Sequence, residues 1–421
     1  MKFAFPSRRR EEAAVLIASL FVGGVLGLVL GSYLFVIRSQ YISTARSQAW
    51  RSALDMAEAG AEEALAHLNP GAGLPPSGAG QIIARSGDHW TGPNNGLYGP
   101  VTRTLDHGSY TVVITGDQNP IIYSTGYVAI PSMSANLSRA VRLTTASVPL
   151  TRAAVASQSN ITMTGTGKTI VFADSFDSTR PNSGTRSNGD VVSLSGKISI
   201  GANIVKGDVF LGPTATGSGQ VRGNTSHDLS IDFPDVVIPS QSWLTPSIAN
   251  TNINGITYRY YFKQGGDYEL TTSGAIYVWA GAGDVKLRIA NDNFDAPSIH
   301  VENSGTAKLT IFLPGSSFKL SGAAVVDGGD PSKLTILGTP STRSIVFTNQ
   351  SSFTGTIYAP SADFTNNVSN NPLSTTVVDF RGALVANSVT VKGLCSFHFD
   401  ENLLKSTSLS AGFFVTSWRE L

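Results

Sequence analysis

Closely spaced aspartates are the first residues in this sequence that could do chemistry. Cleavage of a glycosidic bond needs two carboxylates about 5 to 10 Å apart, one of them with a raised pKa. Glycine, asparagine or serine flanks every candidate pair, and aspartate commonly caps turns in such surroundings. We therefore expect turn capping, and calcium binding by oxygen ligands is an alternative for Asp327 with Asp330. The three candidate pairs are Asp174 with Asp177, Asp292 with Asp295, and Asp327 with Asp330.

His398, followed by Asp400 and Glu401, is the second candidate. A hydrolase or metal site built on it would need a second histidine or an evident nucleophile nearby, and neither is present in the local sequence. His398 alternates with Phe397 and Phe399, so in a strand it faces away from both rings. Packing or a hydrogen bond is the favoured role. We predict no catalytic, cofactor-binding or metal-binding residue, and a protein that is not an enzyme.

The first element that must position the rest of the chain is an apolar helix. Ala13 to Ile37 runs for 25 residues without a charge, long enough to cross a bilayer at about 1.5 Å per residue. The basic residues Lys2, Arg8, Arg9 and Arg10 precede it and predict a cytoplasmic N-terminus (residues 1–11) by the positive-inside rule. A cleaved signal peptide would have a shorter apolar core. We therefore expect a retained single-pass anchor in the inner membrane, with the bulk periplasmic or at the cell surface.

Two patterns indicate that this helix contacts other helices or a folded domain. Gly23, Gly27 and Gly31 share one helix face, where small residues allow a second helix to approach closely. An amphipathic stripe then continues from Trp50 to Leu68, before Asn69, Pro70 and Gly71 end the helix. One helix over residues 12–68, with its transmembrane segment at 13–37, is expected.

Composition favours a β-rich body after the helix. The chain has 421 residues, of which only 14% are charged, and 43 are glycine. This bias suits many turns, and the length suits two or more folded units. A net charge of +1 gives no sign of a nucleic-acid partner. Cys395 is the only cysteine, which excludes an intramolecular disulfide and a zinc site built from cysteines.

Two stretches of the helix carry a family resemblance. Arg8–Leu20 (RRREEAAVLIASL) and Leu54–Asn69 (LDMAEAGAEEALAHLN) resemble the PilX-type minor pilins and other type IV pilin-like proteins. The resemblance implies that the apolar half is stored in the inner membrane and later packs in a filament core. It also implies that Glu11 or Glu12 pairs with the N-terminal amine of a neighbouring subunit. A helix N-terminus that favours negative charge is the alternative role for these glutamates.

The processing site departs from the family pattern. Prepilin peptidases normally cut after a glycine five residues before the glutamate, and Pro6 or Ser7 stands at that position here. Ser7 is the candidate processing position. The departure favours an anchored protein that does not polymerise.

Strand signals follow the helix. Segments 101–115, 121–130 and 137–147 are rich in Val, Ile, Thr and Tyr and are separated by turn signals. We expect a small antiparallel sheet that forms a pilin-like domain over residues 69–147. From Pro149 onwards a glycine repeatedly introduces a short apolar run, which suits a parallel β-helix, with a β-sandwich as the competitor. These glycines are Gly207, Gly274, Gly322, Gly355 and Gly382.

A second resemblance covers about residues 150–405. Ser351–Asn367, Asp379–Gly393 and Phe397–Leu403 resemble motifs of a domain of unknown function often fused to PilX-type N-termini, and Asp174–Ser178 echoes another of its motifs. The resemblance implies a surface-exposed β-helical domain over 148–405 and implies no activity. Residues 406–421 are expected to contain a C-terminal strand.

Together these observations predict an α+β, mostly β protein. It has a long N-terminal transmembrane and amphipathic helix, a small antiparallel sheet, and a right-handed parallel β-helix-like solenoid. The expected function is that of a minor subunit of a type IV pilus or related assembly, presenting the solenoid for adhesion or assembly. A non-polymerising envelope scaffold is the alternative, and a polysaccharide-acting enzyme comes third. Expected partners are the lipid bilayer, other pilin-like subunits, and a surface ligand or polysaccharide, but no nucleic acid.

Overall fold

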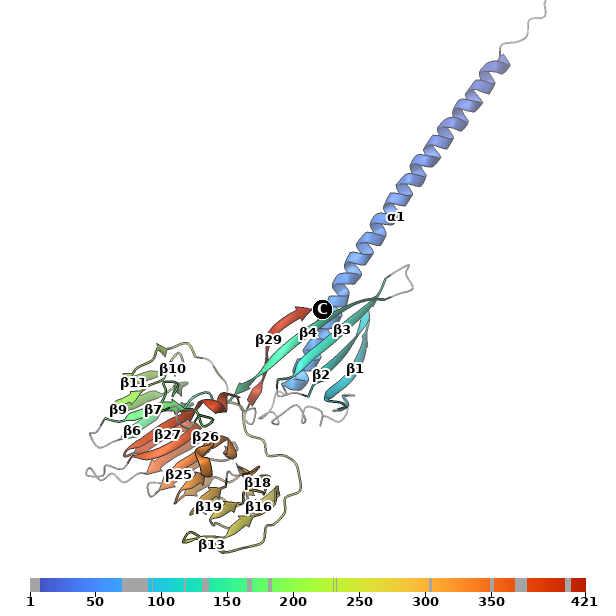
Figure 1. Ribbon diagram of the computed structural model, residues 1–421. Helices are drawn as coiled ribbons and strands as arrows, with labels where there is room; N and C mark the ends of the chain where they lie inside the picture. The colour runs from blue at the N-terminus through green and yellow to red at the C-terminus, as the bar shows by residue number, and fades with distance from the viewer. Residues whose placement is uncertain are drawn as a thin grey trace, which may run out of the picture. The chain divides into compact units, whose positions relative to one another are not determined.

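The computed structural model divides the chain into two compact units, which we describe separately (Figure 1). The first contains residues 1–65, 83–145 and 415–421, and the second contains 66–82 and 146–414. The structure describes residues 8–69, 90–92, 94–116, 119–130, 136–164, 169–180, 184–229, 231, 233–302, 305–348, 352–367, 377–405 and 410–421.

One long helix opens the chain, followed by a mostly β body. Helix α1 runs from Arg8 to Leu68 over 61 residues and so begins slightly before the predicted start. Its apolar first part is exposed, whereas small side chains of its second part are buried. Helical packing therefore begins only in the second half, where alanines recur at helical spacing. The buried positions are Ala49, Ala53, Ala57, Ala61 and Ala64.

The first unit contains a five-stranded sheet in the order β1-β2-β3-β4-β29. Its strands are β1 (Leu97–Leu105), β2 (Gly108–Thr115), β3 (Ile121–Ala129), β4 (Asn136–Pro149) and β29 (Ser410–Glu420). The single strand expected over 101–115 is wrong, because Asp106 and His107 form a turn and Leu105 pairs with Gly108 across it. The C-terminal strand lies beside β4, so residues between these two strands form an insertion within one sheet.

Glycines bring α1 and the sheet into close contact. A Cβ placed on Gly126 of β3 would lie 2.1 Å from the carbonyl oxygen of Ala53 and 2.6 Å from the nitrogen of Ala57. A Cβ on Gly60 of α1 would lie 2.3 Å from Oγ of Ser124. Real Cβ atoms do not approach other atoms so closely, so Gly126 lets the backbones of β3 and α1 pack together, and Gly60 leaves room for the side chains of Ser124 and Tyr110.

A polar cluster ties the end of the helix to the same sheet. Glu63 accepts hydrogen bonds from Arg103 (2.7 Å) and from the hydroxyl of Tyr110 (2.6 Å). Burial, reinforced by the Glu63 carboxylate, raises the pKa of Tyr110 to about 12. The phenol therefore stays protonated and continues to donate to Glu63 at any physiological pH.

The second unit, here called the β body, is built from short strands that pair in parallel. Its first part contains β5 (Val155–Ser157), β6 (Ile161–Thr164), β7 (Val171–Phe176), β8 (Val191–Ser193), β9 (Lys197–Val205), β10 (Val209–Leu211), β11 (Thr216–Val221) and β12 (Thr225–Ser226). The antiparallel hairpin of β13 (Thr251–Ile253) and β14 (Ile256–Tyr258) follows. The second part contains β15 (Tyr260–Phe262), β16 (Gly266–Leu270), β17 (Ile276–Val278), β18 (Asp284–Ile289), β19 (Asn293–Ala296), β20 (Ile299–Val301), β21 (Lys308–Leu313), β22 (Ser317–Leu320), β23 (Ala324–Val326), β24 (Leu334–Gly338), β25 (Ser344–Thr348), β26 (Phe353–Asn367), β27 (Val378–Lys392) and β28 (Cys395–Asp400). Short 3-10 helices are η2 (Asp327–Gly329), η3 (Pro331–Lys333) and η4 (Glu401–Lys405).

The chain enters the β body in the middle of its stack of strands. One ladder reads β12, β10, β8, β5, β27, β26, β24, β21, β18, β16. The first part therefore builds outward from β5 to β12, and the second part starts at the opposite end and returns to β27. Strand β28 closes the seam between the two parts, since it pairs with β27 on one side and β7 on the other.

The segment between β12 and the β13–β14 hairpin crosses the outer surface of the β body. Phe233 and Val236 pack in one apolar cluster with Phe312, Leu337 and other side chains from both parts. The hydroxyl of Tyr358 donates to the carbonyl of Pro234 at 2.8 Å. This crossing segment explains how the chain reaches the far end of the stack before winding back.

The interior of the β body is apolar and rich in stacked phenylalanines. Ring centroids of Phe353 and Phe380 lie 4.7 Å apart, and those of Phe380 and Phe397 lie 5.0 Å apart. Only glycine fits at position 382, because φ of Gly382 is +132° and a Cβ there would lie 1.8 Å from the carbonyl oxygen of Gly355. Both glycines lie inside long strands, so the expectation that they introduce strands is wrong for these two positions.

Candidate functional site

The apolar half of α1 exposes a continuous apolar surface. By length and composition the helix could cross a membrane, and none of its most apolar stretch is buried. Gly23, Gly27 and Gly31 have no atom within 4 Å of a Cβ placed on them, so the predicted small-residue ridge is open. Another helix could approach this face closely, but the ridge by itself does not identify a partner.

The other predicted assembly residues are only partly visible. Glu11 and Glu12 lie in the first turns of α1, and their side chains lie outside the part of the chain that the structure describes. Ser7, the candidate processing position, also lies outside the described residues. All three assignments stay predictions.

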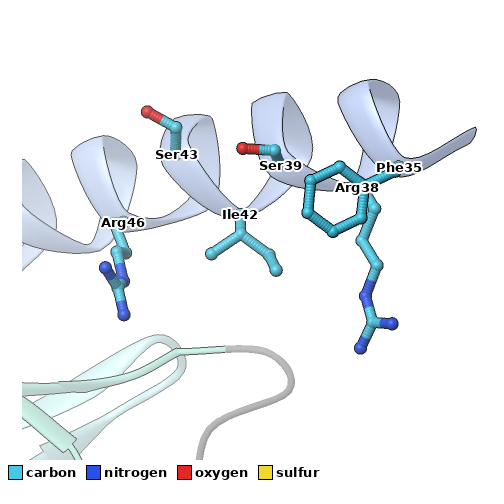
Figure 2. Close-up of a pocket in the computed structure, with 6 residues that line it drawn as sticks. All are labelled: Phe35, Arg38, Ser39, Ile42, Ser43 and Arg46. Carbon is cyan, nitrogen blue, oxygen red and sulfur yellow. The ribbon is translucent and has the colours of Figure 1, made fainter. Parts of the chain in front are cut away.

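A shallow groove follows the apolar half on the same helix (Figure 2). Its volume is about 480 Å³, and only side chains of α1 line it. Arg38, Ile42 and Arg46 point to one side, with Ser39 and Ser43 on the other (Figure 2). A groove between the side chains of one helix encloses no ligand, so we assign it no binding role.

His398, predicted to make a packing or hydrogen-bonding contact, lies at the seam of the β body. Its Nδ1 lies 2.5 Å from Oδ1 of Asp174 on β7, and its Nε2 lies 3.5 Å from Oδ1 of Asp379 on β27. The ammonium of Lys206 binds the other oxygen of Asp174 at 3.1 Å. His398 thus joins the three strands that meet where the two parts of the β body close.

This contact keeps the imidazole charged. Burial by itself would lower the pKa of His398, but hydrogen bonds to Asp174 and Asp379 outweigh it and raise the pKa to about 9. The hydrogen bond from His398 in turn lowers the pKa of Asp379. A histidine that is protonated at neutral pH donates from both nitrogens and has no lone pair for a general base or a metal.

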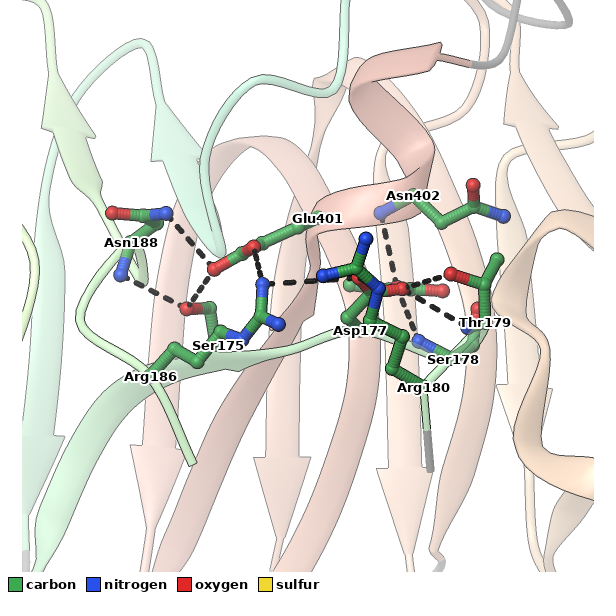
Figure 3. Close-up of polar contacts among 10 residues, drawn as sticks. Ser175, Asp177, Ser178, Thr179, Arg180, Arg186, Asn188, Glu401 and Asn402 are labelled. Atoms are coloured by element: carbon green, nitrogen blue, oxygen red, sulfur yellow. Dashed lines mark hydrogen bonds and ion pairs between the residues drawn. The ribbon is translucent and has the colours of Figure 1, made fainter. Parts of the chain in front are cut away.

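Glu401 organises a second group of polar contacts beside the seam (Figure 3). Its carboxylate accepts from Ser175 (2.9 Å), Asn188 (2.9 Å) and Arg186 (2.5 Å). Arg186 also lies 3.7 Å from Asp177. The network holds the loop after β7 against η4, which follows β28.

The aspartates nearest this network serve as caps. Asp177 accepts from the backbone N–H of Thr179 (3.0 Å) and from its hydroxyl (2.5 Å), and these bonds lower the pKa of Asp177. Asp400 is fully buried and accepts from the N–H groups of Ser178 (3.0 Å) and Asn402 (3.1 Å). Burial raises the pKa of Asp400. Asp174, the other member of the predicted pair with Asp177, is buried and binds Lys206 and His398, so both carboxylates of that pair contact the protein itself.

Three of the four aspartates in the remaining pairs also bind the protein itself. Asp330 caps η3 by accepting from the N–H of Ser332 at 3.0 Å, which confirms the turn-capping prediction there. Asp295 binds Lys319 at 2.9 Å, and Asp327 lies 3.3 Å from His300. Among the residues that the structure describes, no three His, Cys, Asp or Glu side chains form a group that could hold a metal ion.

Sequence reasoning missed Lys206, Arg186 and Asp379 as members of the seam. Each is an ordinary charged residue locally, and only strand register brings it to Asp174, Glu401 or His398. A signal did exist for Lys206, which begins the motif Lys206-Gly207-Asp208, repeated as Asn188-Gly189-Asp190. The repeat places equivalent residues in neighbouring layers of the stack.

Comparison with known proteins gives a partial family match. A domain of unknown function (DUF7305) matches residues 251–406, which include the second part of the β body and most of the motifs noted above. No curated protein matches the chain. The competence-associated pilin ComZ from Thermus thermophilus is a structural neighbour with 16% identity and a TM-score of 0.35, over 88% of this chain and 97% of that one. A TM-score this low carries no conclusion about fold or function.

Proposed function

We propose that this chain is a pilin-like envelope protein, a minor subunit of a type IV pilus or related assembly. The observation that carries the proposal is the division of α1 into an exposed apolar half and a half packed on an antiparallel sheet. An apolar surface of this length is costly in water, so it belongs in a bilayer or between other helices. The open ridge of Gly23, Gly27 and Gly31 suits the second environment as well as the first.

In this proposal the rest of the chain is carried outside the cytoplasm by a single-pass anchor in the inner membrane. The β body is inferred to be a β-helix-like solenoid, because successive strands pair in parallel across neighbouring layers. It is inserted between β4 and β29, adjacent strands of one sheet. Such an insertion would let a subunit display a large binding domain without interrupting the helix that assembles it.

The first experiment determines the N-terminus of the protein in the membrane fraction of its native host by mass spectrometry. A mature chain that begins at Ser7 or Arg8 supports pilin-type processing. An intact Met1 contradicts it and favours the second candidate, a permanently anchored envelope scaffold. That candidate rests on the absence of glycine at the position of Pro6 or Ser7.

A second experiment separates anchoring from assembly. We expect Glu12→Ala to leave the protein in the membrane fraction while removing it from sheared surface filaments. Glu58→Ala is the matched control, because Glu58 is an exposed glutamate on the packed half of the same helix. Equal amounts of both variants in the filament fraction would contradict the assembly role of Glu12.

A further inference from the structure

A row of basic side chains runs across the first part of the β body, beside the seam. The N–H of Lys206 donates to the carbonyl of Ala173, and the N–H of Arg222 donates to the carbonyl of Val205, both at 2.9 Å. Lys206 is therefore the neighbour of Asp174 in the next strand, and Arg222 is the neighbour of Lys206. Strands in such a sheet lie about 4.8 Å apart, so these charges are closely spaced.

The same row continues in the other direction across the seam. His398 pairs with Asp174, and Arg381 pairs with His398. The row therefore contains four cationic residues and one aspartate in five neighbouring strands. In order along the row they are Arg222, Lys206, Asp174, His398 and Arg381. Asp379 contributes one further carboxylate, which contacts His398.

A repeated motif adds a further cation at the same corner. Strand register aligns Val155 of β5, Val191 of β8, Val209 of β10 and Thr225 of β12. The residue three positions before each of these strands is therefore stacked on its equivalents in neighbouring layers. These residues are Arg152, Asn188, Lys206 and Arg222.

The corner is hollowed into a cavity of about 400 Å³ that Arg152, Lys206 and Arg222 line together with Asp190 and Asp208. Lys206 is bound by Asp174, but among the described residues neither arginine has an ion-pair partner. The two aspartates are fixed by the next layer, because Asp190 accepts from the N–H of Asp208 at 2.8 Å and Asp208 accepts from that of Asn224 at 2.7 Å. Within the described part of the chain, the cavity thus combines guanidinium groups that form no ion pair with carboxylates that accept from backbone N–H groups.

We infer that this cavity binds carboxylate-bearing sugars of an acidic polysaccharide, with Arg152 and Arg222 on separate carboxylates and Asp190 and Asp208 accepting from hydroxyl groups. Arginine suits the planar carboxylate because its guanidinium can donate two parallel hydrogen bonds. A DNA backbone fits less well, since it has no hydroxyl groups within the chain to donate to Asp190 and Asp208. The inference rests on the proposed display of the β body outside the cell.

The test uses the purified full-length chain in detergent micelles and measures binding by titration calorimetry in the presence of EDTA. Polygalacturonate is the probe, neutral dextran the uncharged comparison, and double-stranded DNA the phosphate polymer. We expect polygalacturonate to bind and dextran and DNA not to bind at the same salt concentration. Arg152→Gln with Arg222→Gln should weaken binding by on the order of tenfold, as expected for the loss of charge-assisted hydrogen bonds.

Arg343→Gln with Lys392→Gln is the matched control. It removes two exposed cations of the β body that lie outside the cavity. An unchanged affinity in the control supports the site. An equal loss of affinity in both double variants would show that only net charge matters and would overturn the proposed site. Absence of polygalacturonate binding, or tighter binding of DNA, would also overturn it. Because the purified chain is used, each of these results is independent of whether the protein is processed or assembled in cells.

Discussion

The two units of this chain reach a packed interior in opposite ways. In the first, Gly126 lets the backbones of a strand and a helix pack closely, and Gly60 leaves room for side chains of the sheet against the helix. In the second, parallel layers are filled by large rings such as Phe353, Phe380 and Phe397. The helix–sheet contact of the first unit thus depends on the absence of side-chain atoms at Gly60 and Gly126, whereas the interior of the second depends on large rings. Adding volume at those two glycines and removing a ring should therefore act on different units.

The largest effect is expected from removing a ring in the β body. Phe380→Ala should reduce the free energy of unfolding of this unit by about 3 to 5 kcal/mol, because the ring contacts four other phenylalanines and is fully buried. Cys395 provides the measurement, since it is fully buried, and burial raises the pKa of its thiol to about 12. Its rate of alkylation in rising denaturant reports opening of the β body.

Trp279→Ala is the control for Phe380→Ala, because it removes a large ring that is 44% exposed in the same unit. It should change the alkylation midpoint of Cys395 little. If both variants shifted the midpoint equally, the phenylalanine stack would not be the main source of stability in the β body.

A smaller effect is expected from adding volume to the first unit. Gly126→Val should cost about 3 kcal/mol, because a Cβ there overlaps the carbonyl of Ala53 and the backbone of α1 cannot move without losing its contacts. Hydrogen exchange in peptides of α1 around residues 49–65 should accelerate, while exchange in β26 and β27 stays unchanged. Faster exchange in the β body as well would show that the two units do not unfold independently.

Gly27→Val is the matched substitution on the exposed half of α1. No atom lies within 4 Å of a Cβ at Gly27, so exchange in residues 49–65 should remain at the wild-type rate. Under the proposed function the same variant should reduce recovery of the protein in filaments. Comparison of Gly126→Val with Gly27→Val would thus distinguish a glycine needed for folding from a glycine needed for assembly.

The comparison also explains what could be predicted from the sequence. The helix, predicted from Glu12 to Leu68 and found from Arg8 to Leu68, follows from local periodicity and a local stop signal. The turn at Asp106 and His107 was missed although Asp106 and Gly108 favour turns, because the segments on both sides are rich in β-branched residues. Local patterns thus predicted which segments of the first unit are helix or strand better than they predicted where one strand ends and the next begins.

The candidate site lay beyond prediction for a different reason. His398 and Asp174 are 224 positions apart, and they meet only because the chain enters the stack in the middle and closes it at β28. No local pattern encodes that entry point. The repeat that begins with Asn188, Lys206 and Arg222 was available in the sequence, but its meaning depends on the alignment of β8, β10 and β12.

The smallest effect is expected at the seam, and it depends on pH. The pKa of His398 rises from 6.5 to about 9 on folding, so its contribution is complete below pH 6.5 and is lost as the pH rises through 9. We expect the β body to lose about 2 to 3 kcal/mol over this range. Chemical denaturation at pH 6.5, 7.5 and 9, followed by tryptophan fluorescence and hydrogen exchange in β28, would measure the loss.

His398→Gln tests whether the imidazolium causes that loss. Glutamine can still donate to Asp174 or Asp379 but carries no charge, so the variant should be less stable at pH 6.5 and nearly as stable as the wild type at pH 9. The ion pair between Lys206 and Asp174 is present in both proteins and cancels in their comparison. The thiol of Cys395 begins to ionise in the unfolded chain near pH 9, and that effect is common to both proteins. A pH dependence that survived in His398→Gln would therefore assign the loss to other groups and leave the seam closed by its phenylalanine stack alone.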